Sequence, residues 1–136
     1  MTPRLYRVIN PVSDIEVATQ FFSTVLGSAG ERVSPGRHYF ECGGTILACY
    51  DPIADGDDTG EGWRHHGRQY LYFAVADLDA TLDTIKQAGG EVTAGIETMP
   101  WGERIFYALG PGGTPIAFVD ESTVFTGSAD TATADN

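Results

Sequence analysis

Few residues of this 136-residue chain combine the side-chain type and the spacing that a chemical step or a metal site requires. Its three histidines are His38, His65 and His66. Adjacent residues on an extended chain point to opposite faces, so His65 and His66 form a poor chelate. The pair could supply a lid ligand or a general base, although we prefer a solvated loop pair. We expect a structural role for His38, which lies in a predicted strand.

Two tryptophans could serve binding. Trp101 precedes a predicted strand and lies close to Met99 in the sequence, and Trp63 lies in an acidic segment. An exposed tryptophan on a loop suits stacking on a planar ligand. Packing at an interface between modules or subunits explains Trp101 equally well.

Composition and charge indicate the class of protein in which these residues lie and the partners that it could have. The 42% of hydrophobic and 20% of charged residues indicate one globular domain. The net charge of −11 argues against a nucleic-acid partner and permits attraction of a cationic small molecule. The sequence has no apolar run of membrane-spanning length and no signal-peptide core, so we expect no membrane partner and a cytoplasmic location. We expect Cys42 and Cys49 to be free thiols.

An internal repeat organises the chain. The segment GGTILACYD at 43–51 and the segment GGTPIAFVD at 112–120 are identical at five of nine positions. A second pair of similar segments, VSDI at 12–15 and VADL at 75–78, precedes them in the same order. Two matches in the same order predict one supersecondary unit that is used twice.

Module one, residues 5–50, is predicted to form a β-α-β-β-β unit. Ser13 and Glu16 resemble a helix capping box, apolar residues at helical spacing follow them, and Gly27 is a natural helix end. Strands are expected at 5–12, 31–34, 37–42 and 45–50.

Module two, residues 69–120, repeats this order. Asp77 is expected to cap a helix that ends at Gly89-Gly90. Strands are expected at 69–75, 91–94, 103–109 and 114–119. We expect residues 51–68 to be an exposed acidic linker and residues 121–136 to be a flexible tail, so that one domain covers residues 1–125.

The duplicated unit resembles the vicinal oxygen chelate superfamily, which includes glyoxalase I, extradiol dioxygenases and bleomycin resistance proteins. The segment 75–78 resembles the family's strand-to-helix junction. The segments 100–104 and 110–113 resemble its loop and turn before the last strand. The resemblance implies an α+β fold in which two tandem β-α-β-β-β modules form a curled mixed sheet around a cup. It also implies a homodimer.

Active members of that family hold a divalent metal ion in the cup, on the first and last strands of each module. The resemblance assigns those four positions to Arg7, Ala48, Tyr70 and Ala117. Divalent cations prefer imidazole, carboxylate or amide ligands, which these residues lack. We therefore expect no metal cofactor, and we expect the four residues to line a ligand site.

Hairpin geometry predicts which side chains of module one join the cup. A two-residue turn at Gly43-Gly44 pairs Tyr39 with Ala48, and Glu41 then lies on the same face. Glu41 could pair with Arg7 or with a cationic ligand. A solvated strand end explains it equally well.

The same reasoning predicts the cup residues of module two. A turn closed over residues 110–113 pairs Phe106 with Ala117 and Arg104 with Val119. On that register Phe106 and Arg104 join the ligand site.

Three functions are compatible with these observations. The first is a metal-free small-molecule-binding protein, similar to bleomycin resistance proteins, that sequesters an aromatic or cationic compound. The second is a metal-dependent lyase, transferase or dioxygenase that uses other ligands, such as Glu41 or His65. The third is a scaffold or regulatory module without ligand chemistry. The fold alone does not determine a function, so the choice rests on the site residues and the charge. The missing metal ligands, the acidity and Trp101 favour the first function.

Overall fold

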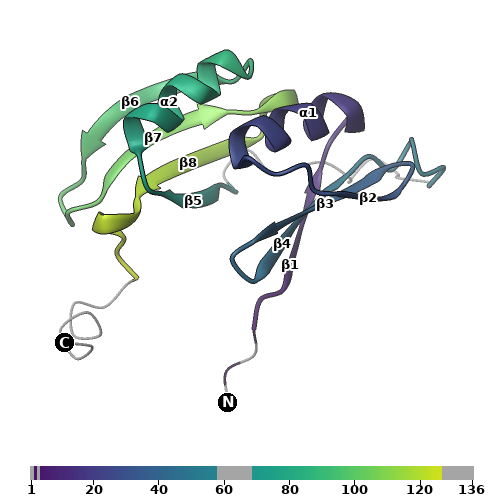
Figure 1. The fold of residues 1–136 in the computed structure, drawn as a ribbon, viewed down its shortest axis with the longest axis horizontal. Helices are drawn as coiled ribbons and strands as arrows, with labels where there is room; N and C mark the ends of the chain where they lie inside the picture. The colour runs from purple at the N-terminus through teal and green to yellow at the C-terminus, as the bar shows by residue number, and fades with distance from the viewer. Residues whose placement is uncertain (1, 3, 58–68, 127–136) are drawn as a thin grey trace.

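The computed structural model describes residues 2, 4–57 and 69–126. Within these residues the chain is an α+β protein with two α-helices and eight strands, which form two four-stranded mixed sheets (Figure 1). The predicted tandem β-α-β-β-β order is confirmed. The predictions for Trp63, His65 and His66 lie outside the described residues. No helix in the described part of the chain is long and apolar enough to cross a membrane.

Module one contains β1 (Arg7–Pro11), α1 (Ile15–Leu26), β2 (Glu31–Ser34), β3 (Arg37–Cys42) and β4 (Thr45–Tyr50). The sheet has the order β1-β4-β3-β2. β1 runs parallel to β4, whereas β3 is antiparallel to both of its neighbours. Helix α1 connects β1 to β2, as the parallel pairing of β1 and β4 requires a crossover.

Module two contains β5 (Leu71–Val75), α2 (Leu78–Gln87), β6 (Glu91–Thr98), β7 (Arg104–Leu109) and β8 (Pro115–Asp120). The order β5-β8-β7-β6 repeats that of module one, with β5 parallel to β8. Strand β6 extends past its predicted end at residue 94 because it stays paired with β7 through two register irregularities.

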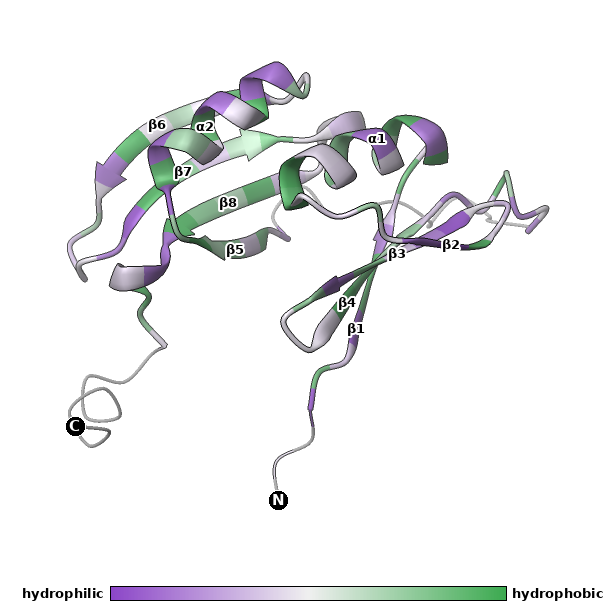
Figure 2. Ribbon diagram, viewed as in Figure 1, coloured by the Kyte–Doolittle hydropathy of each residue, from purple (hydrophilic) through white to green (hydrophobic). Residues whose placement is uncertain are grey.

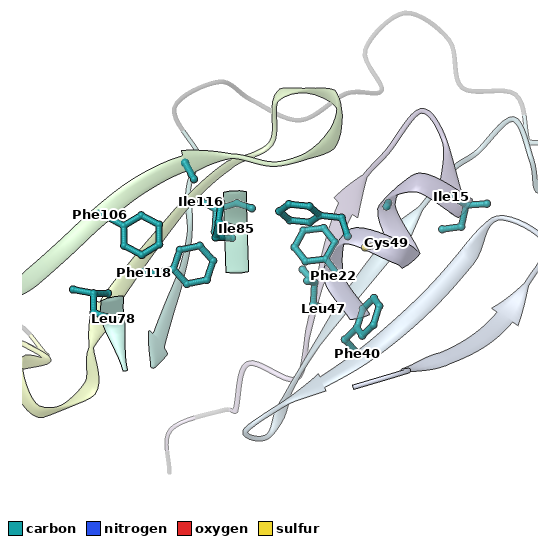
Figure 3. Close-up of a cluster of buried hydrophobic side chains, with 13 residues drawn as sticks. Ile15, Phe22, Phe40, Leu47, Cys49, Leu78, Ile85, Phe106, Ile116 and Phe118 are labelled. Atoms are coloured by element: carbon teal, nitrogen blue, oxygen red, sulfur yellow. The ribbon is translucent and has the colours of Figure 1, made fainter. Parts of the chain in front are cut away.

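One apolar core lies under both helices. Phe22, Phe40, Phe106 and Phe118 belong to the same buried cluster, although they come from different modules (Figure 3). The hydropathy colouring shows the apolar character of β8, one of the two central strands of its sheet (Figure 2). This continuous core fixes the position of each module relative to the other.

Phe21 of α1 packs against module two. Its ring lies beside Gly90 and Gly110 of module two, where an added methyl group would meet it at 3.1 and 3.3 Å. The two glycines therefore allow α1 to approach module two.

The predicted capping residue of α1 is wrong by one position. Asp14, not Ser13, adopts the extended N-cap conformation, and its carboxylate accepts from the backbone N–H groups of Glu16 and Val17. A charged acceptor is favoured at the positive end of a helix. Glu16 instead forms an ion pair with Arg32 at 2.6 Å. The predicted caps Gly27 and Asp77 are confirmed: Gly27 ends α1 in the left-handed conformation, and the Asp77 carboxylate accepts from the backbone N–H of Ala80.

The predicted register between β7 and β8 is also wrong by one residue. Phe106 lies opposite Phe118, and Tyr107 lies opposite Ala117. The connection contains five residues because Thr114 belongs to it: the Gly110 N–H donates to the Thr114 carbonyl at 2.8 Å. A one-residue shift moves every side chain to the other face of the sheet.

Candidate ligand-binding site

The face of each sheet that points away from its helix is called the open face below. On the first sheet, the register places Ile9 and Tyr39 on either side of Ala48, with Arg7 and Glu41 one pair further along. The hairpin prediction for Tyr39, Glu41 and Ala48 is confirmed. These residues share a face because β4 lies between β1 and β3.

The second sheet repeats the arrangement around Ala117. Tyr72 of β5 and Tyr107 of β7 lie directly opposite it on the two neighbouring strands. Both Ala48 and Ala117 have an exposed fraction of 0%. Each module therefore places a methyl group at the centre of its open face and covers it with larger neighbours.

The tyrosines of module two contact one another. The Tyr107 hydroxyl is hydrogen-bonded to Tyr72, and this bond, together with burial, raises the pKa of Tyr107 to about 12. The Tyr70 ring lies 5.7 Å from the Tyr107 ring and 6.4 Å from the Tyr72 ring, in edge-on geometry. A neutral hydroxyl pair thus lies next to the buried Ala117.

On the open face of module one, aromatic rings lie beside two arginines, Arg7 and Arg37, and the Arg37 guanidinium lies 4.3 Å from the Tyr50 ring centre. The Arg7 guanidinium lies 5.1 Å from the Tyr6 ring centre and 5.2 Å from the Tyr39 ring centre. Both distances are within the range of cation–π attraction. Glu41 is exposed, and its carboxylate accepts from the backbone N–H of Gly44 at 2.6 Å, which favours the solvated strand end.

A cavity of about 720 Å³ lies between the two modules. Its walls come from β1, the last turn of α1, the β3–β4 hairpin and β5. Among the described residues that line it, Glu41 is the one charged side chain. The apolar wall includes Val25 and Phe73, and Tyr70 and Tyr72 connect the cavity to the open face of the second sheet. Ligand pockets of this size and character are common in proteins.

Of the predicted site residues, Glu41 and Tyr70 line the cavity, whereas Arg7, Tyr39, Ala48 and Ala117 lie on the open faces but are not among its lining residues. The other three lie neither in the cavity lining nor beside the two alanines. Phe106 is fully buried in the core, where its ring stacks on Phe118 at 5.1 Å. Arg104 forms an ion pair with Asp120 at 3.4 Å, and hydrogen bonds from Ser122, more than Arg104, lower the pKa of Asp120.

Trp101 lies on the β6–β7 loop with 53% of its surface exposed. Its indole N–H donates to Glu103 at 2.8 Å, and Glu103 also accepts from the Phe125 N–H at 2.9 Å. Trp101 is not among the residues that line the cavity. His38 has the structural role that we expected: its ring contacts Arg32 and the Ala29 carbonyl.

Sequence reasoning missed Tyr72 and Tyr107. Tyr72 lies two residues after Tyr70 on the same strand, so strand alternation could have placed it on the same face. Tyr107 could be found only with the correct β7–β8 register.

The residues present do not fit a family-type metal ion. Two of the four positions, Ala48 and Ala117, offer methyl groups that are already covered. A third is Arg7, whose guanidinium is a cation. In the described part of the chain, no three His, Cys, Asp or Glu side chains are grouped as a metal site would require.

The fold and the sequence match a known class of proteins. The chain belongs to the glyoxalase/bleomycin resistance protein/dioxygenase superfamily, whose family model matches residues 4–118. A sequence search of curated proteins finds no match.

Several solved structures share this fold. A glyoxalase-related enzyme from Fulvimarina pelagi has 18% identity and a TM-score of 0.72, with 88% of each chain covered. A glyoxalase/bleomycin resistance protein from Albidiferax ferrireducens T118 has 21% identity and a TM-score of 0.70, with 85% of this chain and 98% of that chain covered. A lactoylglutathione lyase from Agrobacterium tumefaciens has 20% identity and a TM-score of 0.67, with 88% and 94% covered. At these identities the likeness concerns the fold alone.

Proposed function

We propose that this protein binds a small, largely apolar molecule in the cavity between its modules, without a metal ion. The observation that carries the proposal is the cavity itself, which has a ligand-sized volume and a mostly apolar wall. Its described lining offers one charged group, Glu41, so the proposed ligand is neutral or cationic. The homodimer and the cytoplasmic location stay predictions.

The two buried alanines support the metal-free part of the proposal. A metal-dependent lyase or dioxygenase of this family needs ligand atoms that reach the ion from the first and last strands of each module, and β4 and β8 are those last strands. Here Ala48 and Ala117 occupy those strands, and larger side chains already cover them. The chemistry left to the described site is therefore recognition by apolar contact, aromatic rings and a carboxylate.

Blocking the cavity tests the proposal. Val25 lines the cavity from α1, whereas Val17 is on the same helix with 49% of its surface exposed and outside the lining. We expect Val25→Trp to weaken binding of a neutral environment-sensitive dye, Nile red, at least about tenfold, because the indole fills the space. Val17→Trp should bind the dye as the wild type does. Equal affinities of the two variants would contradict the cavity assignment.

A thiol gives an independent readout of the same cavity. Cys42 lines it, and Cys49 is buried, which raises the pKa of that thiol to about 12. A maleimide should therefore label Cys42 first, and bound dye should slow the labelling. Metal analysis after purification without a chelator completes the test. Stoichiometric Zn, Ni, Fe or Mn that is lost on Glu41→Ala or His65→Ala would overturn the metal-free part.

A further inference from the structure

Three tyrosines form an exposed aromatic surface on the second sheet. This surface, called the tyrosine cluster, consists of Tyr70, Tyr72 and Tyr107. Tyr72 exposes 57% of its surface, and Tyr70 is also exposed. The Tyr70 ring is tilted by 61° and 80° from the other two, so the rings present faces in different directions. Rings arranged in this way can surround a ligand group from more than one side.

The repeat shows what the same positions do in module one. Tyr39 is the counterpart of Tyr107, because the two lie opposite Ala48 and Ala117 respectively. In module one, the guanidinium of Arg7 lies over the Tyr39 ring at 5.2 Å. Tyr70 takes the place of Arg7 in module two, because each lies two residues before the residue opposite the central alanine. Module two has therefore gained an aromatic ring where module one has an internal cation.

The charges around the cluster favour a cation. Glu97 of β6 lies opposite Ile105, and Ile105 is two residues before Tyr107 on the same open face of β7. The negative charge of Glu97 contributes to raising the pKa of Tyr107. The described cations of module two are elsewhere: Lys86 is on α2, and Arg104 pairs with Asp120. The open face of the second sheet thus combines ring faces with a carboxylate and lacks a described cation of its own.

We propose that the tyrosine cluster binds an organic cation, such as an alkylated ammonium group, that belongs to a ligand whose apolar part fills the cavity. The inference rests on the proposed function, since Tyr70 and Tyr72 also line that cavity. A weakly hydrated cation is attracted to the negative faces of aromatic rings. The ligand cation would take the role that Arg7 has beside Tyr39.

Two probes of the same shape separate charge from apolar contact. Phenyltrimethylammonium carries a cationic head, and tert-butylbenzene has the same outline without the charge. Titration of both against the full chain, followed by NMR, gives an affinity ratio for each variant. In the wild type we expect the cation to bind more tightly and its methyl signals to shift upfield over the rings.

Matched variants locate the preference. Tyr72→Leu should lower the affinity ratio roughly tenfold, while Tyr72→Phe, which keeps the ring face, should hold it within about twofold. Glu97→Gln should lower the ratio, and Asp79→Asn on the far side of the sheet should not. Tyr72 is exposed, so these changes should leave the fold intact, which circular dichroism checks.

The possible failures are distinguishable. Equal binding of both probes, with affinities that Tyr72→Leu does not change, would overturn the cation site. The cavity proposal would still stand if Val25→Trp abolishes that binding. Binding of neither probe would overturn both. A fall in molecular mass of Tyr72→Leu in light scattering, with an unchanged ratio, would assign the cluster to a contact with a second copy and overturn the inference.

Discussion

Replacing Ala117 with glutamate tests whether the centre of the second open face is filled. Ala117 has no exposed surface and lies between Tyr72 and Tyr107. A glutamate side chain fits there only if the two tyrosines separate. The variant would then contain the carboxylate that a metal site of this family needs, under the cover that the wild type provides.

The expected loss of stability has three parts. Breaking the Tyr107–Tyr72 hydrogen bond costs about 1 kcal/mol. Overpacking a filled site costs about 1–3 kcal/mol. Leaving a carboxylate without a partner costs at least about 1–3 kcal/mol more. The free energy of unfolding should therefore fall by roughly 3–7 kcal/mol, a large share of a typical total of about 5–15 kcal/mol.

Ala74 supplies the matched control. It lies on β5, opposite Val119 on the same open face, and it is exposed. Ala74→Glu should change the free energy of unfolding by no more than about 0.5 kcal/mol. In urea unfolding at fixed protein concentration, a loss of about 3 kcal/mol shifts the midpoint by roughly 1–3 M. Ala117→Val, which adds bulk without charge, separates the steric part.

Equal midpoints for Ala117→Glu and Ala74→Glu would refute the reasoning. Ala117 would then be accessible in solution, and the tyrosines would not cover it. A family-type metal ion would then no longer be excluded at the second sheet, since a carboxylate could occupy position 117 without loss of stability.

Two further predictions concern the tyrosine pair and a turn. The folded-state pKa of Tyr107, about 12, lies above the usual value of about 10, so the stabilisation is complete below pH 10 and is lost as the pH rises through 12. At pH 11 we expect Tyr107 to be about one-tenth ionised and ordinary tyrosines about nine-tenths; phenolate absorbance should resolve this late step, and Tyr72→Phe should bring it back toward the others. A single titration step for all six tyrosines, the same in both proteins, would contradict the hydrogen bond. Separately, Gly36→Ala should destabilise the chain by about 1–3 kcal/mol because the added methyl group would collide with the Asp51 carbonyl, whereas Gly95→Ala, with open space around it, should stay within about 0.5 kcal/mol in thermal unfolding.

The fold could be predicted because its signals are local and occur twice. The predicted bounds of β2, β3 and β4 agree with the structure. A two-residue turn at Gly43-Gly44 leaves one register for the β3–β4 hairpin, and that register is confirmed. The longer connection after β7 contains Pro111 and two glycines at positive φ, so it can close in more than one way. The misplacement of Phe106 and Arg104 follows from that single ambiguity.

The cavity could not be predicted, because it depends on how the modules pack. Its walls come from segments of both modules, and no sequence pattern joins them. Phe21 of α1 lies beside Gly90 and Gly110 of module two, yet a phenylalanine and two glycines occur in many other settings. From the sequence alone, Val25 is indistinguishable from an ordinary core residue. It is identified as a cavity residue only once the position of the second module is known.

The two open faces keep the same central residue and differ in what surrounds it. A carboxylate at Ala48 or Ala117 would be buried next to Ile9 or the tyrosines, so without a metal ion it would lack a partner. Alanine at both positions avoids that cost. The difference then lies in charge: module one holds the cation of Arg7 over its own rings, while the described rings of module two have no such cation. If the proposed ligand binds, this difference in charge would give it one preferred orientation, with its cationic end toward β5.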